Sequence, residues 1–373
     1  MSKRWFQHRC AALRGSLAAA AVVTLAALAT PAVAATEYLL AVTRPNTLHV
    51  VDVAARKVAH SFPIPGDGVP SGIALADDGK VAYILTNRFE SVVGIDLDSG
   101  QQVFRTDMSG PDLRVKALMG MSVSRDGKKL YVHQIPTRLK RTEYESLDTR
   151  IAVYNTADGL GAKPVKTFPA PRRISLLAPG ASNERVVGFG WDVYVFDADK
   201  GVLDKTFPLR HWQRPGIGEP DILDMWNQYE QAGILSTPYY VPKTDVPPTS
   251  PEAFKVGLMN FDLAREQMEF AEVDNAETAI FSAVVNPVKR SEVFTVMNQI
   301  FRVDMTAKKF TQRINLPQTY YAINISGDGR ELYLGGALDS IAVYEAATLN
   351  KLAEITLPGG ADQSVGSIRM VRR

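Results

Sequence analysis

A short strand-like run that ends on an acidic or amide residue recurs along the chain, and it constrains the fold more than any other feature. Each copy is rich in β-branched and aromatic residues and is followed by a polar turn, a pattern typical of β-strands. The seven copies are 48–52, 92–96, 151–155, 193–197, 258–262, 300–304 and 341–345. Their last residues are 44 (52 to 96), 59, 42, 65, 42 and 41 positions apart. A period just above forty residues, with two enlarged units, is typical of a β-propeller.

Each copy fits the third position in a unit of four strands. A tight turn precedes the second strand in three units, at Asp78-Gly79, Asp126-Gly127 and Asp328-Gly329. Asp-Gly supplies the positive φ that hairpin turns require, and alternating apolar residues flank these turns. The acid that ends each third strand stands where the next turn begins. We therefore expect it to accept hydrogen bonds from the turn backbone rather than to join a ring of functional carboxylates.

The two ends of the chain are predicted to complete one blade together. The N-terminal unit has three strands, at 37–42, 47–52 and 57–62, and the strand that it lacks is predicted at 366–371. A C-terminal strand in this position closes the ring and leaves no free sheet edge. The sequence therefore predicts an all-β fold, a single seven-bladed β-propeller domain of four-stranded blades over residues 35–373. An open solenoid is disfavoured because it needs polar caps, which we do not find in the sequence.

Residues 1–34 have the layout of a secretory signal peptide. Basic residues precede an apolar run at 17–28, and Ala32-Val33-Ala34 forms a cleavage site. The apolar run is short and rich in alanine, which disfavours an uncleaved membrane anchor. Lys3-Arg4 is a poor twin-arginine signal, so we expect export by the general route to the periplasm and no membrane span in the mature chain.

Removal of this signal changes the composition of the chain that remains. It takes away four of the 42 basic residues and none of the 40 acidic ones, so the formal net charge falls from +2 to 38 − 40 = −2. Nothing in this balance favours nucleic acid as a partner. The single cysteine, Cys10, also lies in the signal, so the mature chain can form no disulfide, thiolate metal site or Cys-x-x-Cys-His haem attachment. The remaining histidines are scattered over several units without the clustering that metal ligands need, and we predict neither a metal site nor a catalytic residue.

Two units are enlarged, and both enlargements are predicted on one face of the ring. Unit three carries a charged insert at 133–148. Unit five carries an insert at 239–251, besides the stretch 210–215 that opens it. In a propeller, the connections between second and third strands and the connections between blades open on the same face. Long ordered loops on a rigid scaffold are where function usually lies.

Aromatic and amide residues near the predicted loop ends are the candidate contact residues. The groups 226–229, 239–240 and 320–321, with Trp212, are expected on the rim that carries the inserts. For most of them packing between blades is favoured, because large aromatic side chains are usually buried and one of each adjacent pair must face inward. The functional alternative is an apolar surface for a partner protein or a small ligand, with amides to fix a polar group. The candidates for a substrate cleft or subunit interface are Trp226, Asn227, Tyr229, Asn286, Tyr320 and Tyr321.

Several stretches, in order along the whole mature region, give the chain its resemblance to a known family. They are 37–46, Trp226-Asn227-Gln228 followed by 237–240, 283–287, 320–326 and 334–338. Across them the chain resembles the β subunit of quinohemoprotein amine dehydrogenase, which is a seven-bladed propeller of YVTN-like repeats. The Trp-Asn-Gln and Tyr-Tyr stretches carry more of this likeness than the Ser-x-Asp-Gly repeats, which occur in many propellers.

The resemblance implies a periplasmic heterotrimer that oxidises primary amines to aldehydes and ammonia. In that family a dihaem cytochrome c α subunit carries haem c, and a small γ subunit carries cysteine tryptophylquinone made from its own side chains. Electrons leave through the haems to a soluble acceptor. The β subunit holds no cofactor, and the catalytic base belongs to γ. The resemblance thus implies that this propeller seats γ on its loop face and helps to wall the substrate cleft.

Two other interpretations remain open. The heavy subunit of methylamine dehydrogenase is also a periplasmic propeller that holds a small quinone subunit, there with tryptophan tryptophylquinone and no haem subunit. A stand-alone periplasmic propeller used for binding is the alternative from another class. Eight-bladed pyrroloquinoline quinone dehydrogenases are disfavoured, because they need an eighth unit and a tryptophan-bearing repeat. Only Trp191, Trp212 and Trp226 remain after signal removal.

Overall fold

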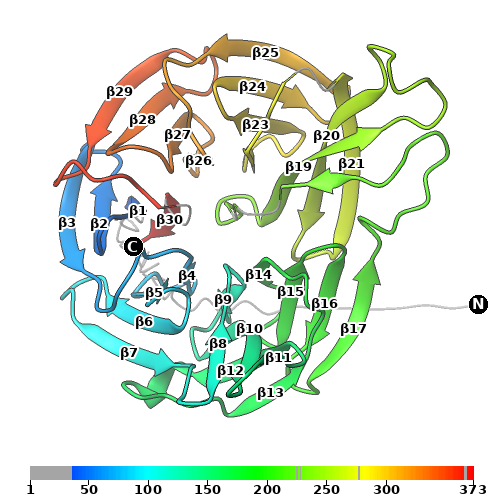
Figure 1. Cartoon of the computed structure of the whole chain (residues 1–373). Coiled ribbons are helices and arrows are strands. Elements are labelled where there is room, and N and C mark those ends of the chain that lie inside the picture. The colour runs from blue at the N-terminus through cyan, green and yellow to red at the C-terminus, as the bar shows by residue number, and fades with distance from the viewer. Residues whose placement is uncertain (1–35, 224–225, 227, 276–277, 365–367) are drawn as a thin grey trace, which may run out of the picture. The chain divides into compact units, whose positions relative to one another are not determined.

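The computed structural model describes residues 36–223, 226, 228–275, 278–364 and 368–373. Its strands form seven antiparallel sheets that follow one another around a central channel, as the blades of a propeller do (Figure 1). Among the described residues, the one short helix is η1 (Thr156–Asp158), and no helix there is long and apolar enough to cross a membrane. The predicted signal peptide at 1–34 lies outside the described residues.

Each blade has four strands, which follow one another from the centre of the ring outward. Blade 1 contains β30 (Arg369–Arg372), β1 (Glu37–Thr43), β2 (Thr47–Asp52) and β3 (Lys57–Pro63), and blade 2 contains β4 (Ile73–Leu75), β5 (Val81–Thr86), β6 (Ser91–Asp96) and β7 (Gln102–Asp107). Blade 3 contains β9 (Met121–Val123), β10 (Lys129–Leu139), β12 (Arg150–Asn155) and β13 (Lys166–Pro169), with β8 (Leu113–Lys116) and β11 (Tyr144–Ser146) added along β10. Blade 4 contains β14 (Leu176–Pro179), β15 (Arg185–Phe189), β16 (Val193–Asp197) and β17 (Val202–Phe207). Blade 5 contains β18 (Asp221–Ile222), β19 (Ile234–Pro242), β20 (Phe254–Asp262) and β21 (Gln267–Asn275). Blade 6 contains β22 (Ser282–Val285), β23 (Glu292–Val296), β24 (Gln299–Asp304) and β25 (Lys309–Asn315), and blade 7 contains β26 (Ala322–Ile325), β27 (Glu331–Gly335), β28 (Ser340–Glu345) and β29 (Lys351–Thr356).

The seven acid-ended runs are the third strands of the seven blades, and each ends on the predicted residue. In β24, the final Asp304 carboxylate accepts hydrogen bonds from the N–H groups of Thr306 (2.9 Å) and Ala307 (3.0 Å). The bond from Ala307 is the main cause that lowers the pKa of Asp304. The same contact with the turn backbone recurs at Asp52, Asp96, Asp197 and Asp262. These bonds confirm that the acids serve the turns.

The C-terminal strand closes the ring, as predicted. β30 pairs with β1 from Glu37↔Arg372 to Leu40↔Arg369. The side chains of Met370 and Val371 are buried against neighbouring blades, and burial of each contributes about 1.5–3 kcal/mol. The described strand covers Arg369–Arg372 rather than the predicted 366–371, of which 366 and 367 lie outside the described residues.

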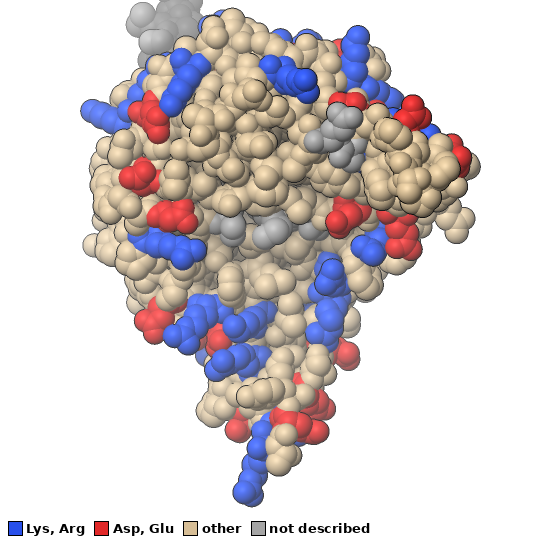
Figure 2. Space-filling model, turned by 45° about the horizontal axis from the view of Figure 1, so that its top comes forward, with Lys and Arg blue, Asp and Glu red and all other residues tan. Residues whose placement is uncertain are grey.

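Strands alternate in direction within a blade, so the connections divide between two faces. We call the insert face the one with the connections between second and third strands and between blades, and the turn face the one with the others. Both enlargements lie on the insert face: β10 runs on to pair with β8 and β11, and β19 pairs with β20 over nine residues. Figure 2 shows a projection of mixed charge at its lower edge, on the side where Figure 1 places β10 and β11.

Two of the aromatic groups are not on the expected rim, and Tyr239 shows the packing between strands that we expected for most of these residues. Tyr239 is fully buried within β19, and its ring packs edge-on against Trp212 and Phe270. The reason is the period of the strand, which turns one residue of each adjacent pair toward the core. Residues 226–229 do not lie on a rim loop either, because they belong to the connection between the first and second strands of blade 5.

Candidate functional site

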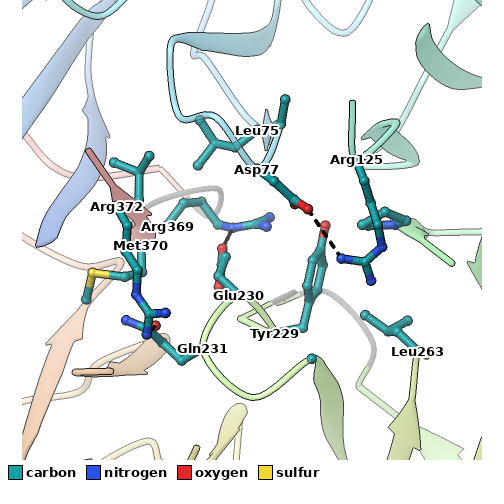
Figure 3. Close-up of a pocket in the computed structure, with 14 residues that line it drawn as sticks. Leu75, Asp77, Arg125, Tyr229, Glu230, Gln231, Leu263, Arg369, Met370 and Arg372 are labelled. Carbon is teal, nitrogen blue, oxygen red and sulfur yellow. Dashed lines mark hydrogen bonds and ion pairs between the residues drawn. The ribbon is translucent and has the colours of Figure 1, made fainter. Parts of the chain in front are cut away.

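The described residues of the segment 223–233, between β18 and β19, enter the central channel (Figures 1 and 3). The segment belongs to blade 5, but its side chains reach blades 1 and 7. Glu230 accepts a hydrogen bond from Asn324 of β26 (3.5 Å), and Gln231 donates one to Glu37 of β1 (3.2 Å). Arg372 of β30 in turn donates to the side-chain oxygen of Gln231 (2.5 Å). We call residues 223–233 the channel segment.

A buried arginine anchors this segment. The Arg369 side chain is buried, its Nε donates to Glu230, and one Nη donates to the carbonyl oxygen of Ile73 (3.1 Å). Its guanidinium carbon also lies 4.9 Å from the centre of the Tyr229 ring. Burial disfavours the charge on Arg369, but Glu230 and Tyr229 together outweigh it and raise the pKa of Arg369. Burial also raises the pKa of Tyr229. The site thus holds a compensated ion pair and a neutral phenol.

A polar cavity of about 280 Å³ lies beside this ion pair toward the turn face. Figure 3 shows Glu230 and Tyr229 of the channel segment between the arginines of blade 1 on the left and Arg125 of blade 3 on the right. Each of these arginines has a carboxylate partner: Asp77 lies 3.5 Å from Arg125, and Glu37 lies 3.0 Å from Arg372. The described residues that line the cavity include no histidine or cysteine, and the described part of the chain has no group of three metal-ligating side chains. The cavity suits water or a small polar group.

Three aromatic rings stack nearer the insert face. Trp226 lies 5.7 Å from Phe281 and 6.4 Å from Tyr321 between ring centres, and the Phe281 and Tyr321 rings are 5.2 Å apart. Their planes deviate by 25° or less. Trp226 is buried, and its indole N–H has no hydrogen-bond partner among the described residues, whereas Tyr321 is 37% exposed. We call these three residues the aromatic wall. It offers an apolar surface at Tyr321, whereas the unpaired indole N–H of Trp226 is itself buried, where an unsatisfied donor costs free energy.

The structure brings together only some of the predicted site residues. Trp226 and Tyr321 meet in the aromatic wall, whereas Tyr229 lines the polar cavity. Tyr320 lies in the core between blades 6 and 7, where burial raises its pKa to about 12. Asn227 lies outside the described residues.

Asn286 is on the turn face, away from the aromatic wall. Its side-chain oxygen accepts hydrogen bonds from the N–H groups of Val288 (2.9 Å) and Lys289 (3.1 Å), and its amide donates to Glu292 (2.9 Å). These bonds hold the turn between β22 and β23, so the side chain does not flank the wall as expected. An Asn that begins such a turn uses its side chain in this way because it mimics a further turn of backbone.

Sequence reasoning missed Phe281, Glu230 and Arg369. Phe281 directly precedes β22, and nothing in the local sequence indicates that its ring stacks on Trp226 and Tyr321. Glu230 and Arg369 are 139 residues apart, so no local spacing links them. The one available signal for this ion pair was Arg369 itself, a single arginine in the predicted closing strand. An arginine in an inner strand is buried and needs a counter-charge.

Comparison with known proteins supports the fold. No family model and no curated protein sequence matches the chain. Its structure is similar to hydrazine synthase from Kuenenia stuttgartiensis, with a TM-score of 0.54 and 13% identity over 84% of this chain and 90% of that chain. It is also similar to the dihydro-heme d1 dehydrogenase NirN in complex with DHE, with a TM-score of 0.51 and 14% identity over 89% of this chain and 75% of that chain. At these identities the likeness shows the propeller fold alone.

Proposed function

We propose that this chain is the propeller subunit of a periplasmic amine dehydrogenase complex of the quinohemoprotein type. In this proposal it seats a small quinone-bearing subunit on its insert face and walls part of the cleft for a primary amine. The dihaem cytochrome c subunit and the soluble electron acceptor complete the complex. Both proteins that share the fold are named for redox chemistry, hydrazine synthesis in one and dehydrogenation in the other. The names of these two proteins agree with a redox role for the proposed complex.

The placement of exposed aromatic side chains carries the proposal. Among the described residues, four aromatic side chains are exposed: Tyr144 (79%), Trp191 (42%), Phe254 (50%) and Tyr321 (37%). All four belong to the insert face, on connections between second and third strands or between blades. Aromatic residues are enriched at the centres of protein interfaces, where they bury a large apolar area. Their gathering on one face of a rigid ring supports a docking face for another chain.

The aromatic wall is the part of this face that we assign to the quinone subunit. The connections around Tyr321, at 297–298 and 316–321, contain no charged residue, so an apolar partner surface meets no charge that must be desolvated there. The rings would exclude water beside the carbon chain of an amine, which favours an apolar substituent over a charged one.

The chemistry itself lies outside this chain in the proposal. Cysteine tryptophylquinone, when present in the partner, takes electrons from the amine, and the haems of the other partner carry them away. Residues 35–373 contain no cysteine and so cannot form that quinone or attach haem c through Cys-x-x-Cys-His. The residues of this chain would orient and shield, and we assign none of them a proton-transfer role.

Purification of the tagged chain from its native periplasm tests the assignment. We expect two companions, identified by mass spectrometry and visible absorption: a protein with c-type haem and a small protein with a quinone chromophore. The complex should oxidise primary amines, whereas residues 35–373 alone should show neither visible absorption from haem or quinone nor amine oxidation. Amine oxidation by the isolated chain would contradict the proposal. A quinone companion without haem would instead favour the heavy subunit of a methylamine dehydrogenase, and no companion would favour a stand-alone propeller.

A pair of matched variants tests the aromatic wall. Tyr321→Asp places a charge in the wall, and we expect it to weaken retention of the small subunit by about tenfold or more, as loss of a central interface aromatic does. Tyr144→Asp makes the same chemical change on the same face, on strand β11 of the projecting hairpin, and should have little effect. Equal effects of both variants would contradict the role of the wall.

A further inference from the structure

We propose that Trp191 and the arginines around it form a docking site for an acidic segment of a partner protein. The site lies on the insert face over blades 3 to 5, whereas the aromatic wall involves residues from blade 5 onward. We call Trp191, Arg172, Arg173 and Arg210 the arginine platform. The proposal does not require the partner to carry a quinone or a haem.

The platform has a tryptophan between two cations. Trp191 stands at the tip between β15 and β16 and is 42% exposed. The guanidinium carbon of Arg173 lies 5.2 Å from its ring centre, and that of Arg210 lies 5.7 Å away. Contact with the ring face holds a guanidinium group in place and leaves its N–H edge available for an anion. The exposed Leu118 shares a small cavity of about 170 Å³ with these residues.

The surrounding backbone fixes this arrangement before any partner binds. A β-carbon at Gly190 would lie 1.7 Å from the carbonyl oxygen of Arg173, so only glycine lets the tip approach the segment that carries Arg173. The buried Asp192 carboxylate accepts the N–H of Leu209 (2.8 Å) and lies 2.7 Å from Nδ1 of His211. The Arg210 N–H also donates to the Trp191 carbonyl (2.6 Å). A preorganised site loses less entropy when it binds.

The charges of the platform are only partly compensated within the chain, because Asp221 is the one carboxylate among the described residues that line its cavity, beside three arginines. In the described structure no carboxylate lies within 4.0 Å of the Arg172 or Arg173 guanidinium, although Arg172 donates to the carbonyl oxygen of Leu147 (2.8 Å). Arg210 has only the exposed Glu219 at 3.6 Å. Arg185 on the turn face, in contrast, has two carboxylates within 2.8 Å. An acidic partner would therefore gain contacts that this chain does not itself provide.

A protein segment fits this site better than other anions do. Guanidinium groups bind carboxylates through two parallel hydrogen bonds, and tryptophan and arginine are the residues most enriched at the energetic centres of protein interfaces. The cavity has room for one side chain rather than for a large ligand. The net charge of −2 for residues 35–373 gives a nucleic acid no general attraction.

The test titrates an acidic decapeptide, with glutamate at alternate positions, into the exported chain at low salt. Binding is followed by calorimetry and by tryptophan fluorescence. We expect the double variant Arg173→Ala with Arg210→Ala to bind at least about tenfold more weakly, since two charge-assisted pairs are lost. The matched control is Arg138→Ala with Arg141→Ala, which removes the same charge from the hairpin on the same face. It should change the affinity by less than about twofold, as expected for peripheral charges.

Four results would overturn the proposal. They are no binding of the peptide by the wild-type chain at low salt, equal losses in the two double variants, competition by inorganic phosphate at the same concentration as the peptide, and tighter binding of a DNA oligonucleotide. Trp191→Phe supplies a second measurement, because it keeps an aromatic face and should retain most of the affinity, whereas Trp191→Ala should not. Near-ultraviolet circular dichroism confirms that each variant is folded.

Discussion

Acidification should destabilise the propeller through His133, a histidine beneath the segment that carries the arginine platform. The side chain is fully buried in β10. Its Nε2 donates to the carbonyl oxygen of Pro171 (2.9 Å), and its Nδ1 has no hydrogen-bond partner in the described structure. A second proton on Nδ1 would find no acceptor there. Burial accordingly lowers the pKa of His133 from 6.5 to about 4.

The size of the effect follows from the two pKa values. The unfolded chain binds a proton as the pH falls through 6.5, and the folded chain does not until about 4, so folding stability is lost across this interval. Linkage gives a loss of about 2 kcal/mol at pH 5.0 relative to pH 7.5, and about 3 kcal/mol once the pH is below 4. This is a large part of the 5–15 kcal/mol typical of a folded domain.

Urea unfolding at pH 7.5 and pH 5.0 measures this loss. His133→Gln keeps an N–H donor for the Pro171 carbonyl but cannot titrate, so its stability should fall by about 2 kcal/mol less than that of the wild-type chain. His49, whose pKa is also lowered by burial, is present in both proteins and cancels in the comparison. The same pH dependence in both proteins would refute the assignment of a low pKa to His133.

Three further predictions concern the channel, the platform and the ring closure. Arg369→Ala leaves the Glu230 carboxylate without its cation and should lower the free energy of unfolding in urea by about 3 kcal/mol, whereas Arg369→Met combined with Glu230→Gln should recover most of the loss. Gly190→Ala places a β-carbon 1.7 Å from a carbonyl oxygen; the tip must shift, and we expect a lower melting temperature and weaker binding of the acidic peptide. Deletion of residues 369–373 removes two buried apolar side chains and unpairs β1; it should cost about 4 kcal/mol or more, seen as a lower melting temperature or as aggregation. A deletion variant as stable as the full chain would contradict the role of β30 in closing the ring.

The fold could be predicted because its determinants are local and repeat. The strand period, the Asp-Gly turns and the acids that cap turns each depend on only a few neighbouring residues. Because the pattern recurs in seven units, an irregular unit does not hide it. The closing strand could also be placed, because a blade with three strands demands a fourth. Its ends were less certain, since strand ends depend on neighbours from distant parts of the chain.

The site was less predictable because it is made by contacts across the ring. Nothing in the local sequence indicates that the connection between β18 and β19 enters the channel, or that Glu230 there meets Arg369. Asn286 illustrates the opposite case. Its side chain accepts hydrogen bonds from Val288 and Lys289, so its place in a turn depends on residues no more than three positions away.

The channel segment gives a physical reason to place function on the insert face. Propellers often use the central channel as a binding site, but here the chain enters its own channel and holds itself there through an ion pair and hydrogen bonds. The insert face, in contrast, presents two exposed surfaces of different chemistry. The aromatic wall adjoins connections without charged residues, and the arginine platform carries three cations that are only partly compensated. Because their chemistry differs, we expect these surfaces to select different partners, or different parts of one partner, and neither proposed role needs a cofactor in this chain.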